Sequence, residues 1–213
     1  VNMLYVRSSL ERANESRREM EAVNVKLMKQ SETDQMTGLA NRYRLNDYSD
    51  KVLDYCYEHR LSLAMEILDI DFFKQYNDNY GHQQGDECII AIADELKKME
   101  DRQTFCARYG GDEFIIIYAG ASAEEVYAKA AALRQNIMDL KLEHLYSKAL
   151  PIVTISQGIS YGVPEEGNRS WDFLHTADML LYQVKKKSRN DICIADIRGQ
   201  ELDLSSKQEK VEP

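Results

Sequence analysis

The chain lacks the sequence features that mark several large classes of protein. Its four cysteines show no Cys-x-x-Cys spacing, so neither a disulfide framework nor a zinc site is indicated. No run of apolar residues approaches the length needed to span a membrane. Only three prolines occur among 213 residues, of which 44% are hydrophobic, a composition that fits a globular domain. Scattered cysteines are typical of a reducing compartment, and we expect a cytoplasmic location.

The chain also lacks a cluster of basic residues. Its formal net charge is -9, and no Lys/Arg block or platform of stacked aromatic residues is present. This acidic balance argues against nonspecific binding to nucleic acid. The length allows one catalytic domain and an appendage.

Two acidic residues stand on a glycine turn at the entrance of an apolar strand. The segment Arg108-Tyr109-Gly110-Gly111-Asp112-Glu113-Phe114 is followed by three isoleucines. Adjacent glycines allow positive φ and a close approach to phosphate, while the β-branched run holds the carboxylates on a rigid strand. Strand alternation would send Asp112 and Glu113 to opposite faces. Taken alone, the motif also fits an ordinary hairpin with solvated acids.

A second acidic segment lies upstream, where an apolar run ends in Asp69 and Asp71 and is followed by Lys74. One or both aspartates can face the Asp112 pair. Carboxylates brought together repel one another unless a cation lies between them, and oxygen ligands select magnesium or manganese. The pattern therefore predicts a metal site. In the alternative interpretation, Asp71 caps the next helix and pairs with Lys74.

Several separated motifs, in the same order, resemble the GGDEF-domain diguanylate cyclases. The resemblance begins with Asp-Gln-Met-Thr-Gly-Leu-Ala-Asn-Arg at residues 34–42, where Met36 replaces the usual leucine. It continues through residues 69–74, 77–86, the 108–114 signature and 153–160, and ends in the helix that carries Lys185 and Arg189. Members of this family condense two GTP molecules into cyclic di-GMP and release two pyrophosphates.

The resemblance implies a role for each matching residue. Asp69 and Asp112 would bind Mg²⁺ or Mn²⁺ through their side chains, and Ile70 through its carbonyl oxygen. Asn77 and Asp86 would hold guanine, because a carboxylate accepts from the guanine N1 and N2 donors that adenine lacks as a pair. The remaining implied substrate contacts are Phe73, Lys74, His82, Gly110, Gly111, Lys185 and Arg189. The implied catalytic residues are Asp112, Glu113 and Lys74.

The predicted activity is therefore that of a magnesium-dependent diguanylate cyclase that acts as a homodimer. One alternative is a catalytically silent GGDEF domain that binds GTP as a sensor or interaction module. Another nucleotidyl cyclase would share the acidic metal ligands, but the Asn77 and Asp86 pair argues against specificity for ATP.

One departure from the family pattern concerns inhibition by the product. Many members bind product through an Arg-x-x-Asp motif, and the corresponding positions here hold Asp101 and Thr104. Arg102 is one position out of register. The usual inhibitory site is therefore predicted to be absent. Ser188, in place of the glycine usual before Arg189, is a smaller departure.

The ends of the chain are predicted to differ from its centre. Residues 1–32 form a charged stretch in which Val6, Ala13, Met20 and Leu27 recur every seven residues, which suggests a short coiled coil. Ser9 and Ser16 interrupt the seam, so a solvated single helix is an equal alternative. We expect this helix to connect residues 33–198, the GGDEF domain, to an upstream sensor, which could be membrane-bound in a longer parent protein. The polar tail at 199–213 is expected to be disordered.

The predicted fold is α/β, with a mixed central sheet and flanking helices preceded by a long helix. Strands are expected near 63–70, 104–109, 112–118, 152–160 and 191–196. Helices are expected near 41–59, 72–79, 83–100, 122–139 and 171–187. The order resembles the palm of nucleotide polymerases and cyclases, with a ferredoxin-like core.

Overall fold

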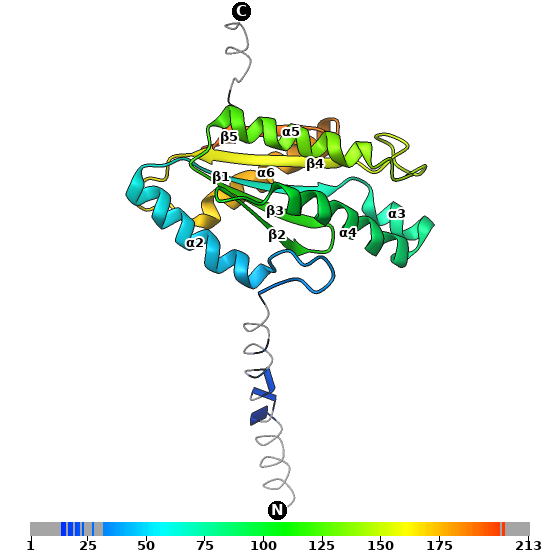
Figure 1. The fold of residues 1–213 in the computed structure, drawn as a ribbon, viewed down its shortest axis with the longest axis horizontal. Coiled ribbons are helices and arrows are strands. Elements are labelled where there is room, and N and C mark those ends of the chain that lie inside the picture. Colours follow the sequence, from blue (N-terminus) through cyan, green and yellow to red (C-terminus); the bar gives the residue numbers. More distant parts are fainter. Residues whose placement is uncertain are drawn as a thin grey trace, which may run out of the picture.

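The computed structural model of the chain describes residues 32–200 and 202, together with residues 14, 15, 17, 18, 20, 21, 23 and 27 (Figure 1). The described residues between 14 and 27 are helical. Most of residues 1–32, for which a coiled coil is predicted, lie outside the described residues. The same is true of most of the predicted tail at 199–213. None of the helices in the described part of the chain is both long and apolar enough to span a membrane.

Five strands of the described region form one mixed sheet with the order β2-β3-β1-β4-β5. Their bounds are β1 Leu63–Ile70, β2 Thr104–Gly110, β3 Glu113–Ala119, β4 Ile155–Gly162 and β5 Ile192–Asp196. Strand β1 lies at the centre, antiparallel to both β3 and β4, whereas β4 and β5 are parallel. The predicted mixed sheet is confirmed.

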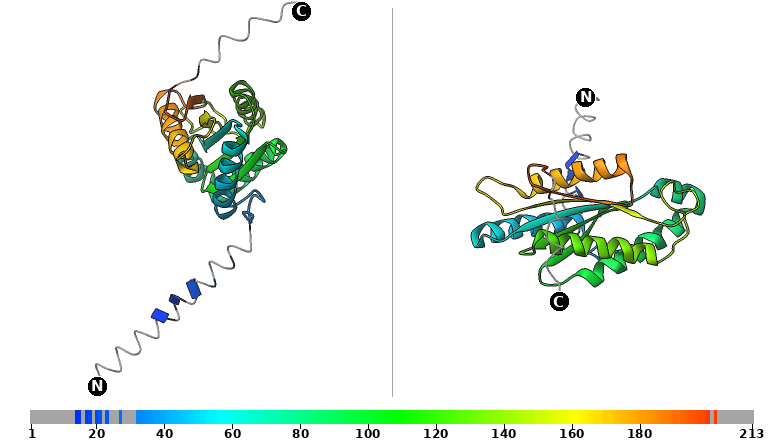
Figure 2. Two further views of the ribbon diagram at one scale, coloured as in Figure 1. Left: turned by 90° about the vertical axis from the view of Figure 1, so that its left-hand side faces the viewer. Right: turned by 90° about the horizontal axis from the view of Figure 1, so that it is seen from above.

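Helices cover both faces of the sheet (Figures 1 and 2). Their bounds are α2 Arg42–His59, α3 Phe73–Tyr80, α4 His82–Met99, α5 Ala123–Asp139 and α6 Ser170–Lys187. Helices α4 and α5 pack on one face, and α2 and α6 pack on the other, as the view along the sheet shows (Figure 2). Helix α3 follows β1 directly and therefore lies at the end of the central strand.

Residues of β1 alternate between the two cores, as expected for a strand buried on both faces. Ala64 and Leu68 pack in the cluster formed with α4 and α5. Leu63 and Met65 pack in the cluster formed with α2 and part of α6. This alternation places Asp69 on the side of the sheet that α6 covers.

Helix α6 approaches the sheet closely at Gly158 of β4. A Cβ atom at Gly158 would lie 2.2 Å from the carbonyl oxygen of Ala177 and 2.3 Å from the amide nitrogen of Leu181. Only glycine leaves room for this contact. One turn beyond Leu181, the same helix carries Lys185 to the end of β1.

The strand predicted near 152–160 begins only at Ile155. Ile152 instead forms an isolated bridge with Glu143, and the carbonyl oxygen of Thr154 accepts a hydrogen bond from the amide of Asp71 at 2.9 Å. The backbone groups at 152–154 thus bind a neighbouring loop and the β1–α3 turn. Residues 152–154 therefore do not pair with β1 in the sheet. Strand propensity alone does not predict this early end of the pairing.

Candidate active site

Two predicted acidic segments meet at the end of the central strand. Asp69 of β1 and Glu113 of β3 are directly opposite each other in the antiparallel ladder. Opposite residues of such a pair point to the same face. Asp112 lies in the turn between Gly110 and Glu113, which are themselves paired. Strand alternation therefore does not apply to Asp112, and both it and Glu113 interact electrostatically with Asp69.

The glycine turn has the backbone conformation that its sequence predicts. Gly111 has a φ of 56°, in the left-handed region that favours glycine. Arg108 donates to the Gly111 carbonyl oxygen from Nη2 at 2.9 Å and from Nε at 3.2 Å. The same guanidinium bonds Asp34 at 3.2 Å. The signature arginine thus fixes the turn and ties it to the segment that enters the domain.

Asp34 anchors that entry segment in turn. Its Oδ1 atom accepts hydrogen bonds from the Thr37 amide at 2.9 Å and the Thr37 hydroxyl at 2.7 Å. Burial acts to raise the pKa of Asp34, but the bonds to Thr37 and Arg108 together hold this pKa below its ordinary value. An ionised Asp34 therefore links the start of the domain to the glycine turn between β2 and β3.

A single ammonium group partly neutralises the acidic cluster. Lys185 Nζ lies 2.7 Å from Asp69 Oδ2. Burial nevertheless raises the pKa of Asp69 to about 6, with further raising by Asp112 and Glu113 and an opposing effect of Lys185. Burial also raises the pKa of Glu113, with Asp112 and Asp178 acting in the same direction and Lys185 against it. The cluster carries more negative charge than Lys185 balances.

The donor set suits a hard divalent cation. Asp69, Asp112 and Glu113 supply carboxylate oxygens, and the Ile70 carbonyl lies on the adjoining residue; Mg²⁺ prefers oxygen ligands of this kind. Within the described residues, no group of three or more His, Cys, Asp or Glu side chains is placed to hold a metal ion together. The fit therefore rests on two carboxylates, on the excess negative charge around them and on the backbone oxygen of Ile70.

Asp71 has a structural role that differs from the predicted helix cap. The N-terminal cap position of α3 is Phe72, without a side-chain hydrogen bond. The fully buried Asp71 instead accepts from the hydroxyls of Thr154 at 2.8 Å and Ser156 at 2.6 Å. It also accepts from the amide of Asn190 at 2.9 Å. These bonds tie the β1–α3 turn to β4 and to the end of α6, so the capping interpretation was wrong.

The predicted phosphate-binding residues surround this turn. Lys74 is exposed on the first turn of α3, whereas the ring of Phe73 packs in the core. Any contact of Phe73 with substrate is thus restricted to its backbone. Arg189 Nη1 lies 3.5 Å from Asp71 Oδ1, and its guanidinium lies over the Phe72 ring at 4.3 Å. Two of the three predicted basic residues, Lys185 and Arg189, therefore pair with aspartates near the end of β1.

The predicted guanine-binding residues lie on the α3–α4 pair. Asn77 Oδ1 is buried and has no hydrogen-bond partner, which leaves an acceptor available to a ligand. It packs on Gly85, where a Cβ atom would lie only 1.8 Å from it. Asp86 and His82 are exposed on the first turns of α4. An unsatisfied buried amide oxygen beside an exposed carboxylate fits recognition of a base edge.

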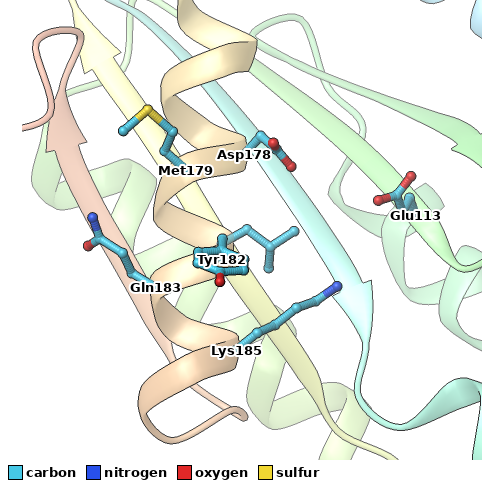
Figure 3. Close-up of a pocket in the computed structure, with 7 residues that line it drawn as sticks. Glu113, Asp178, Met179, Tyr182, Gln183 and Lys185 are labelled. Carbon is cyan, nitrogen blue, oxygen red and sulfur yellow. The ribbon is translucent and has the colours of Figure 1, made fainter.

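A pocket of about 460 Å³ opens beside the acidic cluster (Figure 3). Glu113 and residues of α6 line it, and Lys185 extends from α6 toward β1 in this view. The lining residues of α6 are Asp178, Met179, Leu181, Tyr182, Gln183 and Lys185. Sequence reasoning assigned no function to Asp178 and Tyr182, although their spacing of four and three residues from each other and Lys185 predicts a shared helical face.

Comparison with known proteins defines the class to which this fold and site belong. The sequence matches the family described as "Diguanylate cyclase, GGDEF domain" over residues 31–191. The chain belongs to the GGDEF diguanylate cyclase family. The palm-like fold predicted from sequence is confirmed by this relationship.

Individual relatives of the chain are also named as diguanylate cyclases. The probable diguanylate cyclase DgcC of Escherichia coli K12 is 34% identical over 168 residues, which cover 78% of this chain and 43% of that protein. Diguanylate cyclase DgcP of Pseudomonas aeruginosa is 32% identical over 190 residues, which cover 87% of this chain and 28% of that protein. The chain thus spans less than half of either relative.

Among solved structures, the coiled coil and GGDEF domain of DgcB from Caulobacter crescentus, in complex with c-di-GMP, is similar with a TM-score of 0.71. The identity is 29%, and the match covers 86% of this chain and 97% of that one. The GGDEF domain of the same protein alone gives a TM-score of 0.69.

Proposed function

We propose that this chain condenses two GTP molecules into cyclic di-GMP and releases two pyrophosphates. The observation that carries the proposal is the carboxylate cluster of Asp69, Asp112 and Glu113, whose negative charge Lys185 only partly balances. Such a cluster beside basic side chains suits a magnesium-bound triphosphate.

The base would bind at α3 and α4. The buried Oδ1 of Asn77 would accept from a donor on guanine, and the exposed Asp86 carboxylate would accept from N1 and N2. His82, one turn before Asp86, would add a hydrogen bond. A site built around acceptors discriminates strongly, because the wrong base leaves them unpaired.

The triphosphate would lie along the end of β1. Lys74, Lys185 and Arg189 would pair with its oxygens, and the backbone at Phe73, Gly110 and Gly111 would approach it closely. In this arrangement, a phosphate oxygen draws the ammonium group of Lys185 away from Asp69 and leaves that carboxylate free to bind a cation.

Asp69, Asp112 and the Ile70 carbonyl would hold Mg²⁺ or Mn²⁺. When bound, the cation would offset the charge that develops on the α-phosphate. Glu113 would accept the proton of the attacking 3′-hydroxyl, a role consistent with its raised pKa. Alignment of the two nucleotides supplies most of the remaining rate enhancement.

Each chain has one predicted guanine site, whereas the reaction joins two nucleotides. Two copies would therefore face each other, each holding one GTP. The helix before the domain would set this encounter and transmit the state of an upstream sensor.

The direct test is incubation of the purified chain with GTP and Mg²⁺ over a range of protein concentrations, followed by chromatography for cyclic di-GMP. We expect product to form at a rate that rises more steeply than protein concentration. Asp112→Asn, which removes a charge but little volume, should abolish turnover without unfolding the domain. GTP binding without product at any concentration would favour the sensor function.

A further inference from the structure

A buried histidine of the α5–β4 connection contacts the turn that leads from β1 into α3. His144 is completely buried, and its Nε2 atom lies 3.1 Å from the carbonyl oxygen of Phe72. A carbonyl oxygen only accepts hydrogen bonds, so Nε2 carries the proton. Nδ1 is buried without a partner, and burial lowers the pKa of the ring. His144 is therefore a neutral donor to the turn.

The turn that receives this bond has an unusual backbone. Phe72 has φ 56° and ψ 31°, a left-handed conformation that is uncommon for a residue with a side chain. Its carbonyl oxygen accepts a second bond, from the amide of Tyr76 at 3.0 Å. A conformation of this kind persists only where its surroundings hold it.

The bond from His144, together with the bond from the Tyr76 amide, constrains the direction of a neighbouring donor. No peptide bond in the described region is cis, and in a planar trans peptide the C=O and the next N–H point in opposite directions. Because the Phe72 carbonyl points to His144, the Phe73 N–H points away from it. Phe73 is the first residue of α3, where N–H groups have no intrahelical acceptor and favour phosphate oxygens.

His144 is itself held rigidly. Its ring makes edge contacts with Tyr76 at 5.2 Å and Tyr80 at 6.3 Å between ring centroids. Its amide donates to the Pro151 carbonyl at 3.0 Å, and the following amide, of Leu145, donates to the Tyr80 hydroxyl at 3.0 Å. Backbone and ring contacts thus leave the imidazole little freedom to turn from Phe72.

We propose that His144 is a positioning residue for the cyclase reaction, which orients the Phe72–Phe73 peptide so that the first amide of α3 meets the triphosphate. The inference rests on the proposed function. His144 lies on the α5–β4 connection, outside every motif of the site. The anchors of Asp71 hold one side of the turn, and His144 holds the other.

The test compares two substitutions with opposite properties. His144→Phe keeps an aromatic ring between Tyr76 and Tyr80 but removes the donor, whereas His144→Gln keeps a donor and removes the ring. Tyr80→Phe is the matched control, since it loosens the loop at Leu145 without touching Phe72. Turnover of GTP, calorimetric binding of GTP and thermal unfolding are measured for each variant.

We expect His144→Phe to raise the KM and the dissociation constant for GTP about fivefold, while kcat changes less than about twofold. His144→Gln should restore both values to within about twofold of the original, and Tyr80→Phe should leave them unchanged.

Equal binding by His144→Phe and the original chain, or a Gln variant as weak as the Phe variant, would overturn the inference. If the original chain binds GTP without making product, the cyclase proposal fails, whereas the fivefold binding difference still decides the role of His144.

Discussion

Asp69 and Asp71 are two residues apart at the end of the same strand, yet their surroundings differ completely. Asp71 is fully buried and accepts hydrogen bonds from Thr154, Ser156 and the Asn190 amide. Asp69 has one cationic partner, Lys185, and lies within the field of other carboxylates. The first has a complete set of donors, and the second does not.

This difference separates a structural acid from a candidate catalytic one. A buried carboxylate with its donors in place stabilises the fold and has no capacity left for a ligand. A carboxylate whose pKa is raised by burial and by like charges is stabilised in its ionised form when a cation binds beside it. Both carboxylates are buried beside a basic side chain, so the number of hydrogen-bond donors distinguishes the two groups.

Asp69→Asn should have the largest effect on activity and little effect on stability. We expect turnover to fall on the order of 10³-fold, equivalent to about 4 kcal/mol, because the amide removes a charged ligand from the proposed metal site. The free energy of unfolding should change by less than about 1 kcal/mol, since lost repulsion offsets the lost pair with Lys185. Initial rates with GTP and urea unfolding would measure both. A comparable loss of stability would mean that Asp69 is structural as well.

Asp71→Asn, in contrast, should reduce the stability of the fold strongly. The amide places an NH₂ group among hydroxyl and amide donors, so at least one bond of the β1–α3 turn is lost in a buried site. We expect unfolding to become easier by about 3 kcal/mol. Urea unfolding of this variant beside Asp69→Asn would check it, and equal stability of the two would contradict the distinction drawn between them.

Glu66 is a third buried acid, on the face of β1 opposite to Asp69, and its hydrogen-bond partners are neutral side chains. It accepts from the Tyr118 hydroxyl at 2.8 Å and from Gln157 Nε2 at 2.7 Å. Burial raises its pKa from 4.5 to about 7, against the effect of these two bonds. The folded chain then binds more protons than the unfolded chain between these values, so this group makes stability fall as pH rises from about 4.5 to about 7.

Glu66→Gln should remove that dependence. We expect the variant to be about 2 kcal/mol more stable than the original chain at pH 8 and to differ little at pH 5. The new amide can also donate to Gln157 Oε1, which is buried without a partner. Urea unfolding at the two pH values measures the difference, and a variant that is less stable at pH 8 would show that ionised Glu66 is accommodated.

Gly85→Ala should have the smallest effect and tests the unsatisfied acceptor of Asn77. The added methyl group would displace the Asn77 side chain, because the two would otherwise overlap. We expect the KM for GTP to rise about fivefold with kcat nearly unchanged. Gly81→Ala, where a Cβ atom meets nothing within 4 Å, controls for loss of a glycine near α4, although its φ of 88° adds strain. An unchanged KM would place guanine elsewhere.

Local sequence determined much of this protein. Isoleucine-rich strands, the Gly110-Gly111 turn and the two acids that follow it are evident from residue type and order, and the predicted elements lie within a few residues of those observed. The motifs alone also indicate the family, because they consist of residue types at fixed spacing along the chain. These features depend on neighbours along the chain, where propensity and spacing act directly.

Tertiary structure alone decided which acids are neutralised and by what. Residue order predicts that Asp71 caps a helix, whereas its hydroxyl partners are Thr154, just before β4, and Ser156 within β4, 83 and 85 positions away in sequence. The contact between His144 and Phe72 joins positions 72 apart and belongs to no motif. Sequence by itself determined the elements and the reactive groups, whereas packing assigned partners to those groups, because burial and hydrogen bonding between distant segments depend on three-dimensional proximity.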